Sequence, residues 1–165
     1  MSKIDSKDIS IINLLVEDGR MSCSQIAKKM GNITERAVRY RIDRLLADET
    51  IKISAIASPE KTGYPVTADV FVEVESASIE KVAKELAEYE CVSYVACSIG
   101  NLDISIQIFA KDNSAVYQFM TEVVGKMPGV IKTKTSIFPF QLKAAHDWRI
   151  PTSSNNGFNK IKYKK

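Results

Sequence analysis

Metal ligands and phosphate-binding loops are scarce in this sequence. The three cysteines, at positions 23, 91 and 97, are spaced neither like a zinc knuckle nor like a disulfide framework. The single histidine, His146, leaves a His-Cys zinc site short of nitrogen ligands. The seven glycines are scattered, so neither G-x-x-x-x-G-K nor G-x-G-x-x-G occurs. We therefore expect no metal, no cofactor and none of the familiar nucleotide-binding loops.

Long apolar segments are also missing. No run approaches the roughly 20 residues that a membrane helix needs, and no apolar stretch of the secretory-signal kind follows the charged start at residues 1–5. Hydrophobic residues make up 45% of the chain and charged residues 26%, which is typical of globular proteins. The sequence therefore predicts a cytoplasmic protein without a membrane segment. Its 165 residues suffice for one ordinary domain or two small ones.

Positive charge is distributed unevenly along the chain. Residues 20–52 contain 8 basic and 4 acidic residues, whereas residues 58–150 contain 9 basic and 12 acidic ones. Residues 151–165 add four lysines and no acid. A polyanion would be attracted to the first stretch and to the C-terminal tail, and not to the acidic middle.

A helix is predicted near the N-terminus. Asp5 can cap it, and Asp8 places an acid in its first turn, where the helix dipole favours negative charge. Gly19 is a suitable stop. The apolar residues expected to face the core are Ile9, Ile12, Leu15 and Val16.

Two further helices are predicted to form a helix-turn-helix. A capping box in residues 22–25, with serine at the cap and glutamine three residues later, opens the first of them, and Gly31 ends it. Thr34 caps the second, which runs to about residue 47; Asn32 is the alternative cap. Two short helices joined by a tight glycine turn are typical of DNA-binding modules.

The helix after Thr34 has two chemically different sides. Val38, Ile42 and Leu45 lie within roughly 60° of one another and are expected to pack inward. On the opposite side lie arginines, whose planar guanidinium groups can donate paired hydrogen bonds to guanine edges and phosphates. The alternative is an exposed helix that is merely solvated, but the helix-turn-helix context and the basic stretch favour double-stranded DNA. The candidate DNA-binding residues are Lys28, Lys29, Thr34, Arg36, Arg39, Tyr40 and Arg44. Arg41 borders the core, and we expect it to brace the helix through acids or carbonyls.

The second half alternates between strand and helix patterns. Residues 51–57 alternate like a strand and suit a wing or hinge, and residues 58–65, with two prolines and a glycine, suit a linker. Strands are then predicted at residues 66–74, 92–99, 104–109 and 130–138, with helices capped by Ser78 and Ser114. This order is the split βαββαβ arrangement of ferredoxin-like domains. The expected domains are therefore 1–50 (winged helix-turn-helix), 51–65 (wing and hinge), 66–150 (βαββαβ) and 151–165 (a basic, disordered tail), which makes an α+β protein.

Aromatic residues interrupt the predicted polar face of this sheet. Phe71 lies among Thr67, Asp69 and Glu73, and Phe109 follows Ser105 and Gln107 at alternate positions. Two helices cover only one face of such a sheet, so we expect a second copy of the chain to cover the other. The resulting homodimer would present two helix-turn-helix units to two half-sites of DNA.

The residues resemble the Lrp/AsnC family, the feast/famine transcriptional regulators of bacteria and archaea, over residues 3 to about 142. The resemblance rests on Ile4-Asp5-x-x-Asp8-x-x-Ile11-Ile12, Ile26-Ala27-Lys28-Lys29-Met30-Gly31, Thr34 with Val38-Arg39-Tyr40-Arg41-Ile42-x-Arg44-Leu45, and Gly100-Asn101-Leu102-Asp103. It implies an N-terminal winged helix-turn-helix and a C-terminal effector and oligomerisation domain. It also implies dimers that assemble into tetramers, octamers or hexadecamers, and amino acids bound where dimers meet.

The family resemblance directs attention to the loop between the second and third strands of the sheet. Asp103 can pair with the ammonium of an amino acid, and backbone amides near Gly100 can hold its carboxylate. The alternative is an ordinary hairpin loop. The candidate effector-binding residues are Ser98, Gly100, Asn101, Asp103, Thr133 and Thr135. An effector bound there would change how dimers associate, and so how many helix-turn-helix pairs engage DNA together.

An enzyme is the alternative function. Sirohaem decarboxylases resemble this family in both domains and use histidines and arginines around a tetrapyrrole. This chain has His146 alone, and Arg149 is the one arginine within residues 58–150. A substrate with several carboxylates would need more positive charge than this domain offers. The sequence therefore favours a regulator over an enzyme.

Overall fold

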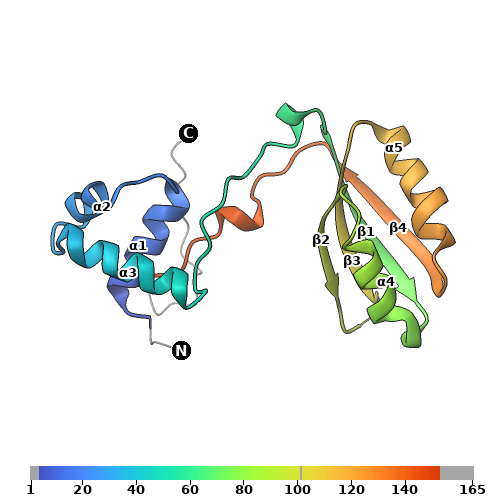
Figure 1. Ribbon diagram of the computed structural model, residues 1–165. Helices are drawn as coiled ribbons and strands as arrows, with labels where there is room; N and C mark the ends of the chain where they lie inside the picture. Colours follow the sequence, from blue (N-terminus) through green and yellow to red (C-terminus); the bar gives the residue numbers. More distant parts are fainter. Residues whose placement is uncertain (1–3, 101, 153–165) are drawn as a thin grey trace. The chain divides into compact units, whose positions relative to one another are not determined.

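The computed structural model describes residues 4–100 and 102–152. The chain forms two compact units (Figure 1). One contains the described residues up to Ala55 together with those from Leu142 onward, and the other spans Ile56–Gln141. No helix among the described residues is long and apolar enough to cross a membrane.

The first unit is built on three helices whose starts are fixed by local hydrogen bonds. They are α1 (Ser6–Glu17), α2 (Cys23–Met30) and α3 (Glu35–Ala47). Asp5 and Asp8 form a reciprocal capping box at α1, and Ser22 and Gln25 form another at α2. The Thr34 hydroxyl accepts from the Ala37 N–H at 3.3 Å, so Thr34, and not the alternative Asn32, caps α3. All three predicted helices are confirmed.

The helical core is small and differs in part from the predicted one. Its buried cluster is Ile11, Ile26, Val38 and Ile42. On α1 the buried face is Asp8, Ile11 and Ile12. The expectation for Ile12 was right, but Ile9 is only half-buried and Val16 is exposed. The buried residues of α1 follow the i, i+3, i+4 spacing that starts at Asp8. The prediction considered apolar residues only, and Asp8 is polar.

The strand expected at residues 51–57 is not formed. This segment has no secondary structure in the described chain. A strand requires a neighbour for its backbone N–H and C=O groups, and the four strands of the sheet pair only among themselves within residues 66–138. The alternation of apolar residues was therefore insufficient to predict a wing strand.

The second unit has the predicted order of elements. They are β1 (Val66–Val74), α4 (Ile79–Leu86), β2 (Val92–Cys97), β3 (Ile104–Ala110), α5 (Asn113–Gln118) and β4 (Val130–Phe138). All neighbouring strands are antiparallel, in the order β2-β3-β1-β4. The chain after α5 continues as a π-helical turn, Phe119–Val123, and a 3₁₀ turn, Val124–Lys126.

Three element ends differ from the expectation, and Ser78 precedes α4 as expected but makes no side-chain capping hydrogen bond. β2 stops at Cys97, where the chain turns into a loop, and β3 continues to Ala110 because that residue pairs with Val66. α5 is capped by Asp112 and not by Ser114, since the Asp112 carboxylate accepts from the Ala115 N–H at 2.8 Å. Either side chain is a good cap, and only the backbone geometry selects between them.

The sheet has one buried and one open face. The buried face contributes alternate residues of β1 and β3, and residues of α4, α5 and the following turns pack on it. The cluster is Ala68, Val70, Val72, Val74, Val82, Ala83, Leu86, Ile104, Ile106, Ile108, Ala110, Val116, Val124 and Met127. Both helices therefore cover the same face. The open face carries the intervening residues, among them Phe71 and Phe109, which are both half-buried.

Candidate nucleic-acid interface

The outer side of α3 presents an arginine-rich surface. Arg36, Arg39 and Tyr40 are exposed, and 69% of the surface of Tyr40 is accessible. Val38 and Ile42 point the other way, into the helical core. Arg39 donates to the Glu35 carboxylate at 3.1 Å, but both side chains are exposed and such i, i+4 pairs are weak. A phosphate can therefore replace Glu35 as the partner of Arg39 at little energetic cost.

Lys28, Lys29 and Thr34 lie on α2 and at the start of α3. Both lysines are exposed at the end of α2, and Lys29 Nζ lies 3.8 Å from a Glu17 carboxylate oxygen. The Thr34 hydroxyl is already engaged as the cap of α3. Five predicted DNA-binding residues are thus exposed on α2 and α3, and Thr34 lies between the two helices.

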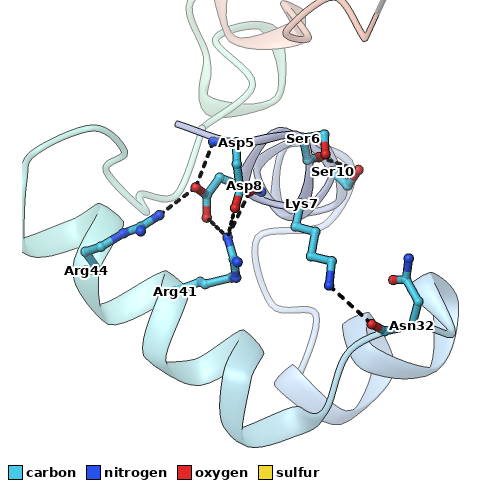
Figure 2. A network of polar contacts seen from close by, with 8 residues as sticks. All are labelled: Asp5, Ser6, Lys7, Asp8, Ser10, Asn32, Arg41 and Arg44. Carbon is cyan, nitrogen blue, oxygen red and sulfur yellow. Dashed lines mark hydrogen bonds and ion pairs between the residues drawn. The ribbon is translucent and has the colours of Figure 1, made fainter. Parts of the chain in front are cut away.

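Arg44 has a different environment from the other candidates. Its Nη2 donates to Oδ2 of Asp8 at 2.6 Å, and only 26% of its side chain is exposed (Figure 2). Arg41 Nη1 donates to Oδ1 of the same Asp8 at 2.8 Å and to Asp5 at 2.7 Å. Asp8 itself is fully buried. Arg41 therefore braces α3 as expected, whereas Arg44 faces α1 and not the outer surface.

These contacts set the charge states of the acids. Burial acts to raise the pKa of Asp8, but hydrogen bonds from the Asp5 N–H, Arg41 and Arg44 outweigh it, so the pKa lies below its ordinary value. The Asp8 N–H and the Arg41 guanidinium lower the pKa of Asp5 to about 2. The same two acids raise the pKa of Arg41. At neutral pH both carboxylates are therefore ionised, and the directional bonds from Arg41 and Arg44 fix the position of α3 against α1.

A second, longer contact joins α1 to the turn of the helix-turn-helix. Lys7 Nζ donates to the backbone carbonyl of Asn32 at 3.5 Å (Figure 2). Asp5, Lys7 and Asp8 of the first turn of α1 therefore contact both α3 and the turn before it. The helical periodicity does not indicate this function of Asp8, although a pair of acids ahead of a basic helix is a signal for it.

The candidate effector loop is closed by its own hydrogen bonds. The Ser98 N–H donates to the Asp103 carbonyl at 2.8 Å, and the Ser98 hydroxyl donates to the Leu102 carbonyl. The Asp103 carboxylate accepts from the Val74 N–H at 2.8 Å and so fastens the loop to the end of β1. Gly100 has a φ of 145°, a conformation that favours glycine. Asn101 lies outside the described residues.

Thr133 and Thr135 lie on β4 at the other edge of the sheet. They pair with Val72 and Val70, so they share the helix-covered face with these two residues. Thr133 is half-buried and Thr135 is exposed. Val72 also pairs with Ile104, the residue after Asp103. Thr133, Val72 and Ile104 therefore form one row across three strands, and Thr133 lies two strand spacings, or about 10 Å, from Ile104. Thr133 therefore lies at the loop end of the sheet, and Thr135 one step farther along.

Both units match known sequence families. The AsnC-type helix-turn-helix domain matches residues 4–46, and the Lrp/AsnC ligand binding domain matches residues 67–145. An uncharacterized HTH-type transcriptional regulator of Pyrococcus horikoshii is 37% identical over 136 residues, 82% of this chain and 85% of that protein. The HTH-type transcriptional regulator LrpA of the same organism is 32% identical over 145 residues, 85% of this chain and 99% of LrpA.

Solved structures share the fold. E. coli AsnC matches with a TM-score of 0.78 at 19% identity, over 92% of this chain and 99% of AsnC. A transcriptional regulator of Neisseria meningitidis, solved as a complex with L-Met, matches with a TM-score of 0.80 at 21% identity, over 86% and 94% of the two chains. The two domain matches and the relatives show that this chain belongs to the Lrp/AsnC family of HTH-type transcriptional regulators.

Proposed function

We propose that this regulator binds specific sequences of double-stranded DNA through α3, and that an amino acid controls how its copies assemble on that DNA. The observation that carries the proposal is the exposed set Arg36, Arg39 and Tyr40 on the side of α3 that is turned away from the helical core. In an AsnC-type helix-turn-helix, α3 is the second helix, the one that enters the major groove.

The residues of this surface suit different parts of the duplex. Arg36 and Arg39 have planar forks that can bind a guanine edge in a bidentate manner, and Tyr40 can bind a phosphate or stack on a sugar. Lys28 and Lys29 are exposed on the preceding helix, which supports phosphate contacts as their function in the proposal. Arg44 is left out of the proposal because it is bound to Asp8. Its contribution is to position α3.

The proposal includes a homodimer formed through the open face of the sheet, and tetramers or octamers assembled from such dimers. Phe71 and Phe109 lie on that face and are incompletely covered within one chain. A second sheet packed against them would bury both rings and bring two helix-turn-helix units to one DNA site. Two half-sites are needed because a single recognition helix reads only a few base pairs.

The effector proposal rests on the loop that contains Gly100 and Asp103. The Asp103 side chain lies beside the end of β1, where its bond to the Val74 N–H holds it in place, and a carboxylate suits the ammonium of an amino acid. Ser98 and Thr133 supply hydroxyls at the same end of the sheet. The Neisseria protein that shares the fold was solved with L-Met, so methionine is the first amino acid to test.

The DNA-binding proposal is tested on sequences selected from random or genomic DNA. Arg36→Ala and Arg39→Ala should each weaken binding, and at least one should relax the preference at one base pair by about 1–3 kcal/mol. The affinity of the unaltered chain should fall steeply as salt rises, because phosphate contacts release counterions. Lys81→Ala, which removes an exposed charge from α4, is the control and should bind normally. Unchanged binding by both arginine variants would refute the assignment of this surface.

The effector proposal is tested by calorimetry and sedimentation with a panel of amino acids, methionine included. Asp103→Asn is the informative variant, because the amide oxygen can still accept from the Val74 N–H while the charge is lost. We expect the active amino acid to change the assembly size of the unaltered chain and to bind the variant at least tenfold more weakly. Equal binding by both proteins would show that Asp103 only fastens the loop.

A further inference from the structure

A side chain of α1 binds the backbone of a segment that follows the sheet in sequence. Asn13 Nδ2 donates to the carbonyl of Ile150 at 2.9 Å, and the Ile150 N–H donates to Asn13 Oδ1, also at 2.9 Å. One amide thereby satisfies both backbone groups of a residue 137 positions away, as a neighbouring strand would. Both residues are half-buried. We call this pair of hydrogen bonds the Asn13–Ile150 clamp, and residues 144–151 the strap.

The strap depends on the clamp for its attachment to α1. The Asp147 carboxylate accepts from the Ala144 N–H at 2.9 Å, so this contact lies within the strap itself. Arg149 Nη1 lies 3.9 Å from Glu17 Oε2, but both side chains are partly exposed and such ion pairs are weak. The matched family domains end at residues 46 and 145, so Ile150 lies beyond both.

The clamp gives the chain a second connection between its two units. The helical unit contains the described residues up to Ala55 and those from Leu142 onward, and the sheet unit comes between them in sequence. One connection precedes β1 and the other follows β4. The second connection restrains the helical unit only if the strap is held on that unit. The clamp supplies this attachment.

Each connection limits the distance between the points that it joins. The first runs from Ile51, whose N–H still bonds the Leu45 carbonyl of α3, to Val66, and it spans at most about 50 Å. The second runs from Phe138 to Ile150 and spans at most about 40 Å. With the clamp formed, the helical unit is restricted to the positions that both connections allow. Without the clamp, only the longer connection remains.

The clamp lies away from the DNA-binding surface. Asn13 is five residues after Asp8 on α1, which places it about 140° around the helix from the side that contacts Arg41 and Arg44. The exposed arginines of α3 are not involved in the clamp. An effect of Asn13 on DNA binding is therefore indirect, through the stability or the position of the helical unit.

We propose that Asn13 is a positioning residue that sets which spacing of DNA half-sites a dimer prefers. The inference rests on the proposed function, in which two helix-turn-helix units bind two half-sites. Once one unit is bound, the affinity for the second half-site depends on the effective concentration of the other unit there. By limiting the positions open to each unit, the clamp raises this concentration at one spacing and lowers it at others. Contacts between α3 and the bases do not provide this selectivity.

The experiment compares three duplexes bound by the intact protein. They carry one half-site, two half-sites at the spacing selected from random DNA, or the same two half-sites with five extra base pairs between them. The insertion is about half a helical turn, so it moves the second half-site to the opposite side of the duplex. The unaltered chain should bind the selected duplex about tenfold or more tightly than the duplex with the insertion.

Asn13→Ala should change the response to spacing and leave the single half-site unaffected. We expect it to bind the selected duplex about threefold to tenfold more weakly than the unaltered chain does. The insertion should then cost it less than about threefold, because a less restrained unit reaches both spacings. Its affinity for the single half-site should be unchanged, since the surface of α3 is intact.

Two shortened chains test the clamp from the side of the strap. The basic tail expected at residues 151–165 lies outside the described residues from residue 153 onward, and both chains lack that part. The chain that ends at Thr152 retains Ile150 and should keep the spacing preference. The chain that ends at Trp148 lacks Ile150 and should behave like Asn13→Ala. Adding Asn13→Ala to this chain should have no further effect, because the partner of Asn13 is absent.

Two controls separate the clamp from other changes in α1. Ser10→Ala alters another polar residue of this helix, whose hydroxyl donates to the Ser6 carbonyl, and it should keep the spacing preference. Hydrogen exchange should show the Ile150 N–H protected in the unaltered chain and unprotected in Asn13→Ala. Equal exchange of this N–H in both proteins would show that the clamp does not form in solution, and would overturn the inference.

The binding results can also overturn the inference, and they distinguish its failure from that of the proposed function. Equal losses by Asn13→Ala on the single half-site and on the selected duplex would mean that Asn13 only stabilises the helical unit. An unchanged spacing preference in Asn13→Ala would mean that the clamp does not position this unit. In both cases the unaltered chain still binds DNA, and the proposed function stands. An unaltered chain that binds none of the three duplexes would refute the proposed function, and the inference with it.

Discussion

The helical unit and the sheet unit are stabilised by different kinds of contact. In the sheet unit, fourteen buried apolar residues form one cluster between the strands and the helices. In the helical unit, the corresponding cluster has four buried residues, and a fully buried carboxylate, Asp8, lies beside it. Arg41 and Arg44 bind that carboxylate from α3. One unit thus depends on apolar burial, and the other depends also on an ionic cluster.

The difference bears on what each unit has to do. Apolar burial is non-directional and stabilises a sheet whose shape is already set by its backbone ladder. The bonds from Asp8 to Arg41 and Arg44 are directional, with distances of 2.8 and 2.6 Å, and they fix α3 against α1. A helix that must present Arg36 and Arg39 to a groove benefits from such a fixed orientation. The comparison therefore predicts that the two units respond differently to loss of volume and loss of charge.

Loss of volume should affect the sheet unit most. Ile106 is fully buried at the centre of β3, between Val70 of β1 and Val95 of β2. Ile106→Ala should lower the free energy of unfolding of this unit by about 4 kcal/mol, through lost burial and an unfilled cavity. Hydrogen exchange resolved by segment should show weaker protection of the four strands and unchanged protection of α1–α3. Ile106→Val is the control and should cost only about 1 kcal/mol. Equal loosening of α1–α3 would contradict the comparison.

Loss of charge should affect the helical unit next. Asp8→Ala leaves Arg41 and Arg44 without their shared partner, and breaking a largely buried ion pair costs about 3 kcal/mol. Hydrogen exchange resolved by segment should show weaker protection of α1–α3 and unchanged protection of the four strands. Trp148, the single tryptophan of the sequence, belongs to this unit and should report the change by fluorescence.

Asp43→Ala is the matched control for that variant. Asp43 is an exposed acid on α3, and its removal should change the free energy of unfolding by less than about 0.5 kcal/mol. A similar loss of stability in Asp43→Ala and Asp8→Ala would mean that net charge, and not the buried cluster, stabilises the unit.

Features determined by local sequence were predictable. The caps at Asp5, Ser22 and Thr34 are hydrogen bonds to residues three positions away, so the sequence contains both partners. Strands β1 and β4 were predicted with their observed bounds, because alternate residues of β1 face the core and glycine, proline or polar residues flank both strands. The exposed positions Arg36 and Arg39 followed from the 100° spacing of helical residues.

Contacts between distant residues were not predictable in this way. Arg44 looked like a DNA-binding residue because its partner, Asp8, lies 36 positions earlier. Asp103 bonds Val74 at a separation of 29 residues, and Asn13 bonds Ile150 at 137. Each of these side chains is polar and suits a surface or a ligand, and only the tertiary fold assigns it an internal partner. The strand expected at 51–57 was wrong for the converse reason, since its pattern fits a strand but no neighbour pairs with it.

Acid should lower the stability of the helical unit before that of the sheet unit. We expect this effect to be smaller than those of Ile106→Ala and Asp8→Ala. Folding lowers the pKa of Asp5 from 3.8 to about 2 and also lowers that of Asp8. A carboxylate with a lowered pKa stabilises the folded state above its ordinary pKa, and this contribution disappears as the pH falls from about 4 towards 2. Trp148 fluorescence should therefore change in this interval, while exchange protection of the strands persists.

Asp5→Asn tests whether the ionic cluster causes the acid response. Asparagine also caps helices, so the hydrogen bond to the Asp8 N–H is retained while the charge that faces Arg41 is lost. The variant should have lower stability at neutral pH and a shallower loss between pH 4 and pH 2, because one of the two titrating groups is gone. If the acid transition of Asp5→Asn were as steep as that of the unaltered chain, Asp5 would not be one of the groups whose protonation destabilises the helical unit. Asp8 alone would then support the contrast between a charge-dependent unit and an apolar one.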